Sequence, residues 1–183
     1  MPPSSTPVPA PAPTPSADAS DGAVPVPTAG DDVDGGRVPP PAGGVDKPCD
    51  PKSGWALADE VTFTMSVPCD LERKDAQGID SQIGKFESNT LRLTYDYGMY
   101  SNPLTSTPGP NAKVSHETIG GLSATLVTAG TPGGGAFPLS AGVHIPRAGK
   151  RRGISLTVWV ECANLEARAT AHKIFRSIRF VER

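Results

Sequence analysis

A run of tyrosines interrupted by an acid is the first feature of the sequence that could do chemistry. The segment LRLTYDYGMYSNP at 91–103 holds all three tyrosines of the chain, two of them flanking Asp96. Tyr95 and Tyr97 alternate in phase with the two leucines before them, so we expect core-facing rings whose hydroxyls reach the rim of a sheet. The chain should bend at the following glycine. Met99 and Tyr100 lie beyond that bend and could line a binding cleft with Asp96 at its edge.

The densest charge in the sequence falls between two expected strands and comprises Arg147, Lys150, Arg151 and Arg152. Cations at the tip of a hairpin are commonly solvated, and they discourage edge-to-edge pairing of sheets. The functional alternative is a contact for lipid headgroups, acidic glycans or an acidic protein. Nucleic acid is not an expected partner, because the surrounding domain is only mildly basic and no aromatic residues interleave with the cluster.

Residue types suited to catalysis are present, but they match no motif. Ser81, His116 and Asp96 could form a triad on paper, yet the sequence lacks the G-x-S-x-G elbow of many hydrolases. The three histidines stand alone, without the paired spacing of a metal site. We therefore expect no metal and no other cofactor. A small hydrolase with a site near Asp96 and Tyr100 is the alternative to a binding protein.

Three cysteines allow one disulfide and leave one thiol unpaired. Cys69 and Cys162 both follow alternating apolar residues at the ends of expected strands, and this shared inward phase favours a bond between them. Pairing through Cys49, in the turn-like segment PCDP, and three reduced thiols are the alternatives. A disulfide would indicate an oxidising compartment.

Composition divides the chain near Cys49. Residues 1–48 contain most of the 21 prolines and no aromatic residue, so they cannot bury enough apolar area to offset the entropy lost when a backbone is ordered. We expect residues 1–48 to be a disordered Pro/Ala-rich linker and residues 49–183 to form a single domain. No apolar run is long enough to span a bilayer, and no signal peptide is recognisable.

A Pro/Ala/Ser segment directly before a cysteine-containing domain is typical of bacterial envelope proteins from which a signal or lipid-anchor sequence has been removed. The sequence therefore predicts a periplasmic or outer-membrane-anchored protein, with membrane contact only through such an anchor. A cytoplasmic protein that begins at Met1 is the alternative.

Alternation of apolar and polar residues predicts the strands that must position these side chains. We expect a strand at 61–69, three hairpins within 83–98, 116–129 and 137–162, and a last strand at 177–181 that closes the sheet. Two consecutive glycines supply the turn of the second hairpin.

The period becomes helical after Asn164, a good N-cap residue, and Glu166 in the first turn favours the helix dipole. The apolar positions that would cover the sheet are Ala171, Ile174, Phe175 and Ile178.

These elements predict an α+β fold: a two-layer sandwich with a largely antiparallel sheet of about six strands and one principal C-terminal helix. The strand TFTMSVP, the central hairpins and the terminal IFRSIRF resemble the Mog1/PsbP-like group of domains, many of which are bacterial envelope lipoproteins. The resemblance implies interaction more than catalysis and carries no functional residues onto this chain. We expect a non-catalytic envelope domain that binds a protein or a cell-envelope component; a secretion-accessory or toxin-neutralising role would be a special case.

Overall fold

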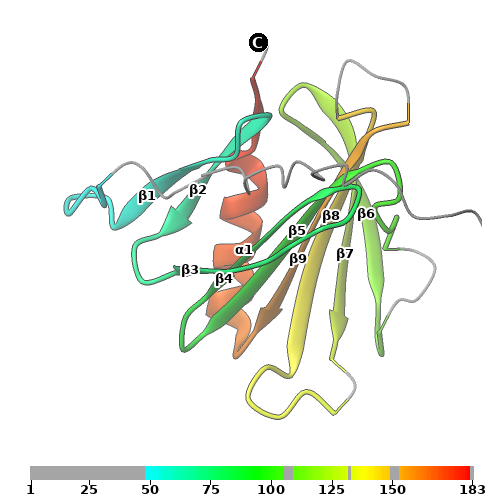
Figure 1. The fold of residues 1–183 in the computed structure, drawn as a ribbon. Helices are drawn as coiled ribbons and strands as arrows, with labels where there is room; N and C mark the ends of the chain where they lie inside the picture. The colour runs from blue at the N-terminus through cyan, green and yellow to red at the C-terminus, as the bar shows by residue number, and fades with distance from the viewer. Residues whose placement is uncertain (1–47, 105–108, 132, 149–152, 182–183) are drawn as a thin grey trace, which may run out of the picture. The chain divides into compact units, whose positions relative to one another are not determined.

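A computed structural model describes residues 48–104, 109–131, 133–148 and 153–181 (Figure 1). Nearly all of the expected linker at 1–48 lies outside the described residues, so its disorder stays a prediction. The described part has one helix and ten strands in two sheets, and all paired strands run antiparallel. The α+β class with mostly antiparallel pairing is confirmed, whereas the expected number of strands was too low.

The larger sheet has seven strands and carries the functional candidates. Its hairpins β4–β5, β6–β7 and β8–β9 confirm the three that alternation predicted. Gly120 and Gly121, with φ of 57° and 82°, supply the turn of the second. In spatial order the strands are β3 (Glu72–Lys74), β4 (Gln82–Glu87), β5 (Leu91–Gly98), β9 (Ser155–Cys162), β8 (Leu139–Pro146), β7 (Leu122–Gly130) and β6 (Lys113–Ile119).

The smaller sheet has β2 (Phe63–Pro68) at its centre, with β1 (Trp55–Asp59) and β10 (Arg179–Phe180) on either side. The expected last strand therefore exists, but the prediction that it closes the main sheet is wrong. The preceding helix ends beside β2, because the Ser177 hydroxyl accepts a hydrogen bond from the Ser66 backbone N–H at 2.8 Å. The residues after Ser177 therefore pair with β2. The strand also begins two residues later than expected, at Phe63, because Val61 is 44% exposed and has a φ of 64°.

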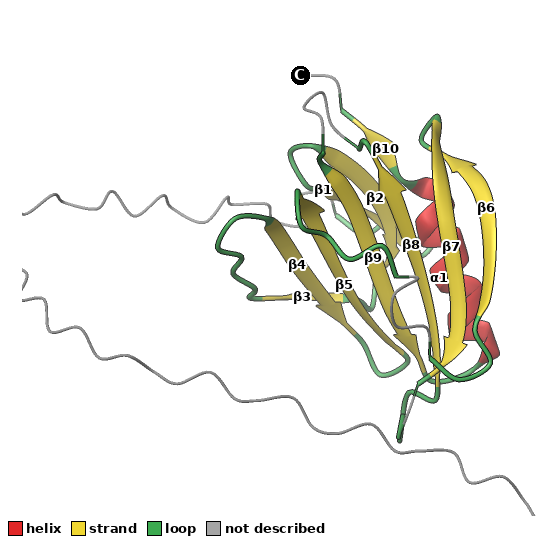
Figure 2. Cartoon of the chain, turned by 90° about the vertical axis from the view of Figure 1, so that its right-hand side faces the viewer, coloured by secondary structure: helices red, strands yellow, loops and turns green. Residues whose placement is uncertain are grey.

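The helix α1 (Leu165–Ser177) begins and packs as its sequence predicts. The Asn164 side chain accepts a hydrogen bond from the Ala167 N–H at 2.9 Å, which caps the first turn. The apolar face of α1 is buried. The helix and the smaller sheet lie against the same side of the larger sheet (Figure 2). Between the two sheets, the rings of Phe63 of β2 and Tyr95 of β5 meet edge-on, with 5.2 Å between their centroids. The other side of the larger sheet, which we call the outer face, is crossed by the chain that leaves β5 (Figure 2).

The structure pairs Cys69 with Cys49, so the predicted Cys69–Cys162 disulfide is wrong. The two cysteines follow apolar residues of different sheets, so their shared phase did not bring them together. Cys69 follows β2 in the smaller sheet and is exposed. Cys162 ends β9 in the larger sheet, where it is registered with Leu91 and Leu139. Cys162 is a buried free thiol, and burial raises its pKa to about 12. The described residues include no helix of the length and apolar character that crossing a bilayer requires.

Candidate binding site

Two neighbouring strands at the centre of the larger sheet aim polar and aromatic side chains at the outer face. Alternation in β5 puts Leu93 and Tyr95 inward, and Thr94 and Asp96 outward. The register sets Thr94 opposite Trp159 of β9 and Asp96 opposite its Thr157. These four outward residues are therefore direct or diagonal neighbours across one strand pair.

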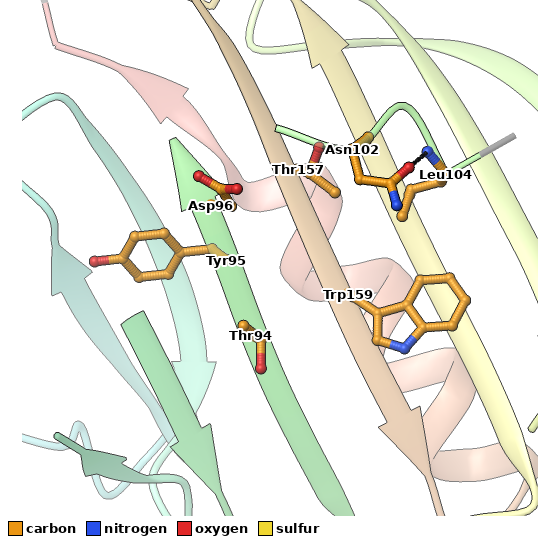
Figure 3. A pocket seen from close by; sticks show the side chains of 7 residues that line it. All are labelled: Thr94, Tyr95, Asp96, Asn102, Leu104, Thr157 and Trp159. Atoms are coloured by element: carbon orange, nitrogen blue, oxygen red, sulfur yellow. Dashed lines mark hydrogen bonds between the residues drawn. The ribbon is translucent and has the colours of Figure 1, made fainter. Parts of the chain in front are cut away.

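The chain that follows β5 folds over these residues and turns a flat sheet surface into a pocket. The Thr157 hydroxyl donates to the Asn102 carbonyl oxygen at 2.7 Å, and the buried hydroxyls of Ser101 and Ser155 are hydrogen-bonded to each other. Asn102 in turn accepts a hydrogen bond from the Leu104 N–H at 2.8 Å. The outer-face pocket so formed has a volume of about 330 Å³ and is lined by Thr94, Tyr95, Asp96, Asn102, Leu104, Thr157 and Trp159 (Figure 3).

The indole of Trp159 lies over a glycine of the adjacent strand. A Cβ atom on Gly142 would stand 2.5 Å from Cε3 of Trp159 and 2.6 Å from Cδ1 of Leu104, closer than real Cβ contacts come. Only glycine therefore lets the indole and the Leu104 side chain occupy these positions. In Figure 3 the ring turns its face to the viewer on the outer side of the sheet, and the Tyr95 ring points away from the pocket.

We expect Gly142→Ala to displace the Trp159 indole and to lower the free energy of unfolding by about 1–2 kcal/mol, as overpacking does. The two indole N–H signals in a ¹H–¹⁵N spectrum check this prediction, because the Trp159 signal should move and the Trp55 signal should not. Gly121→Ala is not a suitable control, since its positive φ adds strain. Ala141→Gly tests the same strand without adding volume. An unmoved Trp159 signal in Gly142→Ala would contradict the described packing.

Asp96 brings a carboxylate to the pocket whose bonding is incomplete. Its Oδ1 atom is buried and has no hydrogen-bond partner in the described part of the chain. A buried acceptor without a partner costs roughly 1–3 kcal/mol. Asp96 also makes no salt bridge with any described lysine, arginine or histidine. Asp96 thus brings to the pocket lining a carboxylate without a described salt-bridge partner.

His144, which is paired with the lining residue Thr157, donates a hydrogen bond to that threonine. His144 Nδ1 lies 2.9 Å from the Thr157 hydroxyl, which already gives its single proton to the Asn102 carbonyl. Nδ1 must therefore carry the proton in this contact. Burial lowers the pKa of His144, so the ring is neutral at pH 7. His144 in this tautomer cannot accept a proton from Thr157, and the pair is not an activated nucleophile.

The triad that could be assembled on paper is not assembled in the fold. His116 lies on β6 at one edge of the larger sheet, and three strands separate it from Asp96 on β5. At about 4.8 Å between strands, the separation is on the order of 19 Å. Within the described ranges, no group of three or more histidine, cysteine or acidic side chains could hold a metal ion.

The other residues expected to bind either do not line the pocket or lie outside the described residues. Met99 and Tyr100 are 62% and 76% exposed and precede the chain that covers the outer face, but neither lines the pocket. Arg147 is exposed at the end of β8 with φ of 59°. Lys150, Arg151 and Arg152 lie outside the described residues, so their role stays a prediction.

A buried ionic cluster between the two sheets was missed by the sequence reasoning. Glu60 is fully buried at the turn after β1, and its oxygens accept from Arg73 at 2.7 and 2.9 Å. The Tyr95 hydroxyl donates to the same carboxylate, and Gln82 donates to the Glu60 carbonyl at 2.8 Å. In β1 the buried positions are Ala56 and Ala58, and the same alternation continues to Glu60. This alternation could have indicated from the sequence that Glu60 is buried.

Electrostatics explains how this cluster holds its charges. Burial, followed by the hydrogen bond to Glu60 and the Glu60 charge, raises the pKa of Tyr95, which keeps its hydroxyl protonated as a donor. Burial lowers the pKa of Arg73, but the hydrogen bonds and charge of Glu60 outweigh burial and leave that pKa raised. The Glu60 cluster therefore joins the turn after β1 to β3, β4 and β5.

A second pocket of about 410 Å³ lies near the start of α1, and its lining includes Trp55, Asp70, Glu166 and Lys173. The chain has two tryptophans, one in each pocket. Each indole can therefore report on its own pocket.

Comparison with protein-family models finds none that matches this chain. The search of curated proteins likewise finds no relative.

Proposed function

We propose that this chain is a non-catalytic binding domain of the bacterial cell envelope and that its partner binds in the outer-face pocket. The observation that carries the proposal is the convergence of an indole face, a leucine and an incompletely bonded carboxylate in one concave site. An apolar wall with a few placed polar groups is typical of binding sites. The one hydroxyl–histidine contact at this site has the wrong tautomer for nucleophilic catalysis, which favours binding over a hydrolase.

The proposed location rests on the disulfide and on the resemblance to Mog1/PsbP-like domains. Cys49 and Cys69 are both exposed, and an exposed disulfide persists where the medium is oxidising. A periplasmic or outer-membrane-anchored protein meets that condition.

Two indole signals give a direct test of the proposed site. The ¹⁵N-labelled full chain is titrated with envelope components of defined chemistry: muropeptides, lipid-headgroup analogues and short peptides with different side chains. We expect at least one class to shift the indole N–H signal of Trp159 while the signal of Trp55 stays in place. Trp55→Phe assigns the two signals.

A blocking variant makes the test specific. Thr94→Tyr places a large ring in the pocket and should abolish the shift, whereas Lys85→Tyr, an exposed position directly opposite Thr94 on β4, should not. Equal binding by Thr94→Tyr and the wild type would remove the outer-face pocket from consideration.

A further inference from the structure

We infer that the group recognised by the outer-face pocket is the cationic side chain of a protein partner, a lysine ammonium or an arginine guanidinium. This inference rests on the proposed binding function and adds the chemistry of the ligand. It follows from the charge of the lining, from the orientation of its aromatic wall and from the exposed apolar residues beside it.

The lining carries one sign of charge. Asp96 is its single carboxylate, and no described basic residue lines the pocket or forms a salt bridge with it. Tyr95 contributes no second charge, because its ring points away from the pocket and its pKa is raised by burial (Figure 3). An anionic ligand would be repelled here. A neutral ligand could satisfy the carboxylate only by donating hydrogen bonds, whereas a cation also compensates its charge.

The aromatic wall also favours a cation. The Trp159 indole lies on the outer face with its π surface turned outward (Figure 3), and tryptophan is the strongest partner for a cation within about 6 Å of a ring. Asp96 is the diagonal neighbour of Trp159 across the β5–β9 pair, at roughly 7–8 Å. A long cationic side chain can therefore pack along the indole and extend its charged end toward the carboxylate.

The apolar part of the wall suits the stem that carries such a charge. Leu104 and the indole stand side by side over Gly142, so methylene groups can pack on them while the charge reaches Asp96. A macromolecular partner is favoured over a small free amine because Met99 and Tyr100 leave large apolar surface exposed close by. A protein that inserts a cationic side chain would cover that surface.

Matched peptides test the inference on the full chain. Ac-Gly-Lys-Gly-amide and Ac-Gly-Arg-Gly-amide are compared with Ac-Gly-norleucine-Gly-amide, which has a neutral stem of similar length, and with phosphoethanolamine. We expect the lysine or arginine peptide to shift the Trp159 indole signal and to bind about tenfold or more tightly than the norleucine peptide, the usual range for a hydrogen bond to a charged group.

Removal of the Asp96 charge makes the test more specific. Asp96→Asn keeps the shape of the side chain and should reduce the affinity for the cationic peptides to that of the norleucine peptide. Asp70→Asn is the matched control, because it removes a carboxylate from the second pocket. Trp159→Leu should weaken the binding of the cationic peptides by a few-fold through loss of the π surface, as measured by calorimetry because this variant lacks the reporting indole.

The outcomes separate the inference from the proposed function. If a neutral or anionic component shifts the Trp159 signal and the cationic peptides do not, the inference fails and the binding function stands. If phosphoethanolamine binds more tightly than the peptides, the inferred protein source is overturned. If no tested ligand moves the Trp159 signal, both fail. The comparison of wild-type affinities decides the matter even if Asp96→Asn folds poorly.

Discussion

Replacement of Arg73 with leucine is expected to lower the free energy of unfolding by about 3 kcal/mol. The change leaves Glu60 fully buried with no cation, and removal of one partner of a buried ion pair typically costs 3–5 kcal/mol. We place the effect at the lower end because the Arg73 side chain is 26% exposed and water can partly replace it. Urea unfolding of the wild type and the variant measures the difference.

An adjacent ion pair on the same strand is the control. Lys74 and Glu72 meet at 2.8 Å with both side chains exposed, so Lys74→Leu should leave the urea midpoint nearly unchanged. The double variant Glu60→Leu with Arg73→Leu should recover much of the loss, since no uncompensated charge remains. An Arg73→Leu protein as stable as the Lys74→Leu protein would show that the Glu60 cluster does not hold the sheets together.

Replacement of both Cys49 and Cys69 with serine is expected to destabilise the domain by about 3 kcal/mol. The bond closes a loop with a sequence separation of 20 residues, and cross-links of about that length typically contribute 2–4 kcal/mol. Both positions are exposed, so the serine hydroxyls remain hydrated and the loss reports on the cross-link itself. Thermal or urea unfolding with and without reductant should give the same difference for the wild type.

Thiol chemistry supplies the independent check. Non-reducing peptide mapping should find Cys49 linked to Cys69, and Cys162 should react with a thiol reagent only after unfolding, because it is buried and its pKa is raised. Rapid labelling of Cys162 in the folded protein, or a Cys69–Cys162 peptide, would contradict the structure.

Local pattern was sufficient to predict the hairpins and the helix but not their partners. The glycine pair at 120–121, the Asn164 cap and the i, i+3, i+4 spacing of α1 are decided within a few residues of sequence, and all three were predicted correctly. The strand at 179–180 was also recognised, but alternation does not say which sheet edge a strand joins. The three-residue strand β3 was missed because ERK is too short to show alternation.

The candidate site shows the same division. Asp96 was expected at the edge of a cleft lined by Met99 and Tyr100. It lines the outer-face pocket, but those two residues do not. Trp159 and Thr157 reach Asp96 only through the register of β5 with β9, strands that are far apart in the sequence. Glu60 and Arg73 were missed for a related reason, since each looks like an ordinary surface residue until its partner across the fold is known.

The Cys49–Cys69 bond also determines how mechanical load enters the domain. A pull applied to the chain before Cys49 crosses the disulfide to Cys69, at the end of β2. The strands β1 and β2 both lie inside the closed loop, so backbone tension bypasses them and continues from Cys69 towards β3. The first strand to take the load is then β3, at the edge of the larger sheet, where the Arg73 side chain is bonded to the buried Glu60. Reduction of the disulfide would direct the whole load to the start of β1, which could then peel from β2 one hydrogen bond at a time.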